Sequence, residues 1–139
     1  MIILDTNVLS ELMRPAPSPV VRAWVASQPA TRLYATTITQ AEILNGLALV
    51  ADGNRRNALA NAARQMFAED FADRLLEFDA AAAEAFASIA AARRQQRRPM
   101  ATLDAQIAAI AASQTAELAT RNVADFLDCG ILLINPWDA

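Results

Sequence analysis

The chain has 139 residues, of which 55% are hydrophobic, and its net charge is −3. Histidine and lysine are both absent, which excludes Ser-His and Cys-His catalysis, Schiff-base chemistry and phosphate loops that need a lysine. The negative charge argues against a broad surface for polyanions. We therefore expect any chemistry to depend on carboxylates, which usually act through a hard cation.

The length predicts one domain, residues 1–139, with a core of its own. No apolar run is long enough to span a membrane, and Asp5 interrupts the apolar start, so we expect neither a membrane helix nor a signal peptide. Cys129 is the only cysteine, which rules out an internal disulfide and fits a cytoplasmic location. We expect its side chain to be buried.

The first half of the chain alternates short apolar segments with helical patterns. We predict a strand at 2–4, a helix at 7–14 that the following prolines end, a helix at 19–28 begun by Ser18, a strand at 33–36, and a helix to residue 50 capped by Thr37 or Thr39. Residues 52–54 then break the chain.

The second half continues the alternation. We predict a helix at 55–70, a strand at 75–78, a helix from Asp79 to residue 98 ended by Pro99, a helix at 102–113, and strands at 117–120 and 131–134. Short strands alternating with helices indicate an α/β fold with a mostly parallel sheet covered on both faces.

Asp5 directly follows the first strand and precedes Thr6 and Asn7, which favour turns and helix starts. In open parallel sheets, ligands bind beyond the carboxyl ends of the strands. Asp5 is thus either a ligand-binding carboxylate or simply the N-cap of the next helix.

Two further acids lie near the starts of predicted helices. Glu42 has Gly46 one turn along, which leaves room over its side chain, although a solvent-exposed helix glutamate is the alternative. Asp104 lies on the same face of its predicted helix as Ile107, Ala108 and Ala111. The helix dipole explains why an aspartate stands in the first turn, but explains less well why it shares a face with apolar residues.

A polar turn follows the strand predicted at 117–120. Thr120 and Asn122 supply polar oxygen atoms, Asp125 supplies a carboxylate, and an ordinary capped turn with Phe126 in the core is the alternative. Bringing these acids together with Asp5 raises their pKa values through mutual repulsion, a cost that a divalent cation reverses. Mg²⁺ suits such an oxygen-rich site.

Four segments of the sequence resemble the PIN-domain proteins of the VapC or FitB toxin type, from prokaryotic toxin–antitoxin pairs. They are residues 3–7 (ILDTN), 39–46 (TQAEILNG), 103–108 (LDAQIA) and 118–126 (LATRNVADF). The resemblance implies a three-layer α/β/α fold with about five parallel strands. It also implies an endoribonuclease that depends on Mg²⁺ or Mn²⁺ and hydrolyses RNA with a metal-activated water.

The resemblance assigns the family's first three acids to Asp5, Glu42 and Asp104, as catalytic residues and metal ligands. The fourth does not transfer directly, because some relatives have an aspartate where this chain has Asn122, and Asp125 is the nearest acid. The polar residues beside these acids are expected to support the carboxylates, and they are Thr6, Asn7, Thr120 and Asn122.

Arg94, Arg97 and Arg98 lie close together near the end of the long helix predicted after Asp79. They form either a solvated helix end that complements the dipole or a contact for RNA phosphates. The resemblance adds two protein partners: a second copy of the chain, and a cognate antitoxin in the same or a larger complex.

Three other readings compete with the nuclease. A receiver domain normally needs a lysine, and a haloacid-dehalogenase-like phosphatase needs an aspartate where Asn7 stands. The third is a catalytically impaired PIN-like module that only binds protein, since Asn122 replaces an acid.

Overall fold

A computed structural model describes residues 1–139 and contains one five-stranded sheet in which every neighbouring pair is parallel. The spatial order is β3-β2-β1-β4-β5, so β1 lies in the centre. The strands are β1 (Ile2–Leu4), β2 (Leu33–Thr36), β3 (Leu75–Leu76), β4 (Glu117–Ala119) and β5 (Leu133–Ile134).

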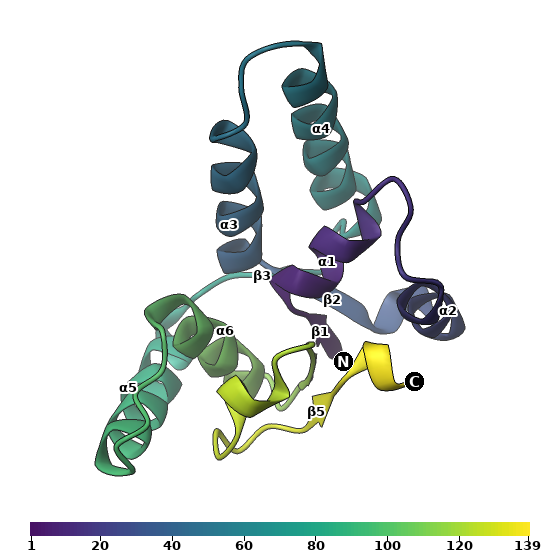
Figure 1. Ribbon diagram of the computed structural model, residues 1–139. Helices are drawn as coiled ribbons and strands as arrows, with labels where there is room; N and C mark the ends of the chain where they lie inside the picture. The colour runs from purple at the N-terminus through teal and green to yellow at the C-terminus, as the bar shows by residue number, and fades with distance from the viewer.

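Six α-helices surround this small sheet (Figure 1). They are α1 (Thr6–Leu12), α2 (Pro19–Ser27), α3 (Thr37–Ala48), α4 (Asn54–Gln65), α5 (Ala80–Gln95) and α6 (Thr102–Ser113). Four short helical segments complete the chain, namely η1 (Ala30–Arg32), η2 (Met66–Asp70), η3 (Val123–Phe126) and η4 (Pro136–Asp138). In Figure 1, α5 and α6 lie together on one side, and α3 and α4 project side by side on the other.

The core has two halves, one on each face of the sheet. Ile2 and Leu4 of β1 pack with residues of α1 to α4, whereas Ile3 packs with residues of α5 and α6. Successive side chains of a strand point to opposite faces, so a central strand buried on both sides must be apolar at every position. This arrangement confirms the three-layer α/β/α fold with five parallel strands.

Several predicted elements agree closely with the structure. The strand at 33–36 and the helix at 102–113 have the predicted bounds. Ser18 caps α2 through Val21 N–H, and Asp79 caps α5 through Ala82 N–H at 2.9 Å. The helix predicted at 55–70 is present as α4 followed by η2.

Other predicted bounds were wrong. The cap of α3 is Thr36, not Thr37 or Thr39, because Thr36 is still extended and its hydroxyl accepts from Thr39 N–H at 3.1 Å. That helix ends at Ala48, and α1 covers 6–12 instead of 7–14. Three strands are one or two residues shorter than predicted, ending or beginning at Leu76, Ala119 and Leu133.

The end of α5 shows the largest error. Pro99 does not end this helix, which stops at Gln95, and Arg97 has a left-handed backbone with φ of 58°. The side chain of Arg93 donates from Nε to the carbonyl of Arg98 at 2.8 Å, which holds the chain in this reversed path. None of the helices is both long and apolar enough to cross a membrane.

Leu118 and Leu132 allow a matched test of the core between β4 and the helices α5 and α6. Leu118→Ala removes methyl groups from a fully buried side chain and should lower the free energy of unfolding by about 2–5 kcal/mol. Leu132→Ala makes the same change at a side chain that is 71% exposed and should cost less than about 0.5 kcal/mol. Urea denaturation measures both, and equal losses would contradict the described core.

Candidate metal centre

The carboxyl ends of β1 and β4 bring two distant polar segments together. These strands pair in parallel with Leu4 opposite Ala119, and Asp5 N–H donates to the carbonyl of Ala119 at 2.9 Å. Asp5 and Thr120 therefore leave adjacent strands at the same edge of the sheet, as predicted for parallel strands.

The carboxylate of Asp5 is buried, with 4% of the residue exposed, and three donors of the protein hold it. Oδ1 accepts from Thr6 N–H at 2.8 Å, and Oδ2 accepts from the Thr120 hydroxyl at 2.8 Å and from the Asn7 amide at 3.3 Å. Asp5 is also the N-cap of α1, so the second alternative considered for this residue is confirmed, and ligand binding by Asp5 stays a prediction. A buried carboxylate needs such bonds because water no longer stabilises its charge.

Thr6 connects this segment to α3. Its hydroxyl donates to Glu42 Oε1 at 2.8 Å and lies 2.9 Å from the hydroxyl of Thr39, which then serves as the donor to Thr6. Glu42 is partly buried, so the bond fixes one of its oxygen atoms and leaves the other free of protein donors.

Thr120 is the centre of the later polar turn. Its hydroxyl donates to Asp5 and accepts from the backbone N–H of Asn122 at 3.0 Å and from the Asn7 amide at 3.3 Å. The Asn7 side-chain oxygen accepts from Arg121 N–H at 3.2 Å. Thr6, Asn7 and Thr120 thus support the site through their side chains, whereas Asn122 contributes only its backbone and its exposed amide forms no bond to the protein.

The pKa shifts show which acids repel one another: Glu42 and Asp104 act on Asp5, and Glu42 and Asp125 act on Asp104. Burial, together with weaker repulsion by Asp104 and Glu42, raises the pKa of Asp5 to about 6, despite the opposing bonds from Thr120 and Thr6. Burial, followed by repulsion from Asp125 and Glu42, raises the pKa of Asp104. All four predicted acids therefore belong to one electrostatic cluster.

No cation of the protein neutralises this cluster. The three ion pairs of the chain lie elsewhere, at Glu11–Arg14, Asp52–Arg56 and Asp128–Arg98. Several carboxylates without a basic partner make a donor set that suits a hard divalent cation. In this chemical sense Asp5, Glu42, Asp104 and Asp125 fit a Mg²⁺ or Mn²⁺ ion.

The side chains are not arranged around a common point. No group of three or more histidine, cysteine, aspartate or glutamate side chains lies where it could hold a metal ion. Asp5 is fixed by its three donors, but the carboxylates of Asp104 and Asp125 accept no hydrogen bond from the protein and are partly or fully exposed. Coordination of one ion by these acids would therefore require their side chains to rearrange.

Two cavities flank Glu42. One of about 340 Å³ lies between α1, α3 and α4 and is bordered by Arg14 and Arg55. The other, of about 330 Å³, lies between α3 and the start of α6 and is bordered by Asn45 and Leu103. Both include Gly46, where an added Cβ would meet no atom within 4 Å, so the room predicted over Glu42 is present.

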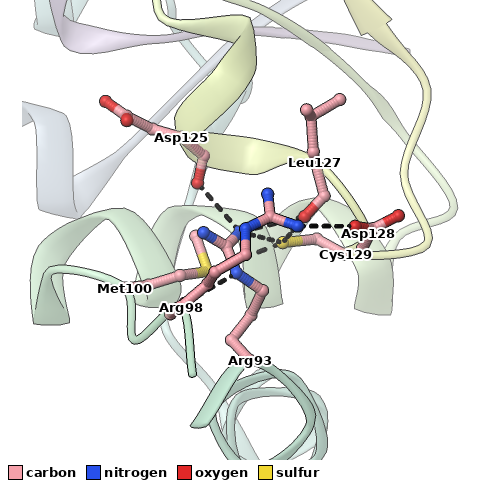
Figure 2. A network of polar contacts seen from close by, with 7 residues as sticks. All are labelled: Arg93, Arg98, Met100, Asp125, Leu127, Asp128 and Cys129. Carbon is pink, nitrogen blue, oxygen red and sulfur yellow. Dashed lines mark hydrogen bonds and ion pairs between the residues drawn. The ribbon is translucent and has the colours of Figure 1, made fainter. Parts of the chain in front are cut away.

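The predicted arginine group divides in the structure. Arg94 and Arg97 are exposed and form no ion pair, whereas Arg98 pairs with Asp128 at 3.0 Å. Arg93 stands beside them in the sequence but was not predicted as a site residue; it is buried and donates to the carbonyls of Asp125 and Leu127 (Figure 2). Its position four residues after the buried Ile89, on the core face of α5, was the available signal.

Comparison with curated proteins finds relatives along the whole chain. The chain is 40% identical to the plasmid stability protein StbB of Pseudomonas syringae pv. tomato, with complete coverage of both proteins. It is 36% identical to Toxin FitB of Neisseria gonorrhoeae and 36% identical to VapC ribonuclease Y4jK of Sinorhizobium fredii, with 99% coverage of each chain in both cases.

Comparison with solved structures supports the same relationship. The crystal structure of FitAcB from Neisseria gonorrhoeae matches with a TM-score of 0.94 and 36% identity over all of both chains. The family model described as PIN domain matches residues 2–128. The resemblance seen in the four sequence segments is therefore confirmed, and the chain belongs to the PIN-domain family.

Proposed function

We propose that this chain is a divalent-cation-dependent endoribonuclease and the toxin of a toxin–antitoxin pair. The observation that carries the proposal is the buried carboxylate of Asp5 beyond the carboxyl end of β1, linked through Thr6 to Glu42, repelled by Asp104 and without a basic partner. Relatives named VapC ribonuclease and Toxin FitB, each 36% identical, support the reaction and the role. The proposed protein partners are a cognate antitoxin and a second copy of the chain.

Asp5, Glu42, Asp104 and Asp125 would hold the Mg²⁺ or Mn²⁺ ion. When bound, the ion would supply activation of the attacking water and neutralisation of charge on the phosphate. Thr120 and the Thr6 N–H keep the carboxylate of Asp5 in one orientation, and the Thr6 hydroxyl keeps Glu42 in another. The cavities beside Glu42 leave space for an RNA strand to approach these acids.

A second function is favoured by one specific observation. Because no three acidic side chains are arranged to hold an ion, a PIN-like module that binds protein without catalysis is the alternative. Isothermal titration with Mg²⁺ and Mn²⁺ separates the two proposals. Binding with cleavage that a chelator stops supports the nuclease, whereas neither binding nor cleavage supports the module.

Asp5→Asn should lower the rate of RNA cleavage by about a hundredfold or more, because the amide removes the best-oriented carboxylate of the site. Glu11→Gln is the matched control, since Glu11 is the other buried acid of the chain and lies outside the cluster, paired with Arg14. The measurement is cleavage of a labelled RNA with Mg²⁺ or Mn²⁺. Equal rates for Asp5→Asn and the native chain would contradict the assignment.

Stability should depend on pH through Asp5. Its pKa in the folded chain, about 6, exceeds its ordinary value of 3.8, so the folded state binds more protons between these values and loses stability as the pH rises through this window. The loss reaches about 3 kcal/mol at most. Thermal denaturation in chelator from pH 4 to 7.5 should show this fall in the native chain and a flatter profile for Asp5→Asn.

Arg94 and Arg97 are predicted to contact RNA phosphates from the end of α5. Replacing both with glutamine should weaken RNA binding and reduce the slope of log affinity against log salt by about 1.4, roughly 0.7 for each phosphate that an arginine no longer neutralises. Fluorescence anisotropy in an Asp5→Asn background measures binding without cleavage. Arg22→Gln, at an exposed arginine of α2, is the control, and an unchanged slope in the double variant would count against the assignment.

A further inference from the structure

We propose that Arg93 is a positioning residue for the candidate metal centre, because it ties the turn that carries Asp125 to the helix pair that carries Asp104. This inference rests on the proposed function, since it concerns the affinity of the acidic cluster for a divalent ion.

The guanidinium of Arg93 binds backbone groups on two sides (Figure 2). Nη1 donates to the carbonyls of Asp125 at 3.1 Å and Leu127 at 2.9 Å, on and just after η3. Nε donates to the carbonyl of Arg98 at 2.8 Å, in the segment between α5 and α6. One side chain thus joins the end of α5, the approach to α6 and the η3 turn.

The burial of this cation is costly and has no carboxylate to offset it. Arg93 is 5% exposed and forms no ion pair, so the three carbonyl dipoles and the nearby Sγ of Cys129 must stabilise its charge. The planar fork of an arginine allows several such bonds at once, which the single ammonium of a lysine cannot reproduce. The geometry favours a role in fixing the three backbone segments.

The connection to the acids runs through the backbone of Asp125. Its carboxylate is exposed and accepts no hydrogen bond from the protein, so the backbone sets the range of positions that the side chain can reach by rotation. The turn that carries it is a 3-10 segment of only four residues. Asp104 lies in the first turn of α6, which packs along α5, so Arg93 sets the separation between the two acids.

Charge and position make opposite predictions for a substitution at Arg93. Removing a positive charge near an acidic cluster should by itself strengthen the binding of a cation. Releasing the turn should weaken binding, because Asp125 no longer lies at a fixed distance from Asp104. The direction of the change therefore separates the two effects.

The experiment is a double-mutant cycle on Mn²⁺ affinity, measured by calorimetry with the full chain and without RNA. We expect Asp125→Asn and Arg93→Met each to weaken Mn²⁺ binding by about tenfold, within the usual range for groups that orient ligands. The combined variant should bind no more weakly than Asp125→Asn alone. Arg93→Lys, which keeps the charge, should also weaken binding.

Arg74→Met is the matched structural control. Arg74 likewise donates to backbone carbonyls, those of Ala30, Leu33 and Asp70. It precedes β3, the outer strand on the other side of β1 from β4. It should lose stability without losing Mn²⁺ affinity. Circular dichroism and thermal denaturation verify that each variant is folded.

Amide exchange at Asp125 provides a readout that needs no metal. Its N–H donates to the carbonyl of Asn122 at 3.0 Å, a bond that protects it from exchange. The protection factor of this N–H should fall about tenfold in Arg93→Met but not in Arg74→Met. The proposal would be overturned if Arg93→Met weakened Mn²⁺ binding equally in the native chain and in Asp125→Asn. It would also be overturned if Arg93→Met strengthened Mn²⁺ binding or left amide exchange at Asp125 unchanged. Failure of the native chain to bind Mn²⁺ would instead overturn the proposed function, while the exchange comparison still decides whether Arg93 holds the turn.

Discussion

The buried carboxylate of Asp5 is the constraint on which the site depends. An unpaired charge in this position would be strongly unfavourable, and the chain supplies three hydrogen bonds instead of a basic partner. Those bonds only partly offset the burial, since the pKa of Asp5 is still raised to about 6. A nearby positive charge would stabilise the ionised carboxylate, and no basic side chain of the protein forms an ion pair with it.

The sheet explains why the acids gather where they do. Both faces of β1 are buried, with Ile2 and Leu4 in one half of the core and Ile3 in the other. Polar side chains are therefore placed after the end of the strand and not within it. Thr120 follows the neighbouring β4 in the same direction, and its hydroxyl both donates to Asp5 and accepts from Asn122. The pairing of β1 with β4 thus brings the Asp5 carboxylate, the Thr120 hydroxyl and the turn at Asn122 together without a ligand.

The sequence predicted the elements whose signals are local. Asp79 capped α5, Ser18 capped α2, and the apolar runs of β1 and β2 stood at their expected places. Thr36 was missed as a cap because it completes a strand and begins a helix at once. The end of α5 was missed because the chain reverses at Arg97, before Pro99, and the Arg93 side chain holds the carbonyl of Arg98 in that path. Of the site, the strand ends predicted that Asp5 and the turn after Thr120 would lie side by side, whereas the positions of Glu42 and Asp104 depend on packing between distant helices.

The proposed metal centre takes its fourth carboxylate from Asp125, because residue 122 is an asparagine. An acid at residue 122 would lie two residues from Thr120, whose hydroxyl already holds the backbone of that residue. With an asparagine there, the nearest carboxylate is that of Asp125, which is three residues farther along a short 3-10 turn. The Thr120 contact restrains this turn at its start, and Arg93 restrains it at its end. In the proposed metal centre, the placement of Asp125 therefore depends on the buried guanidinium of Arg93 as well as on the Thr120 hydroxyl.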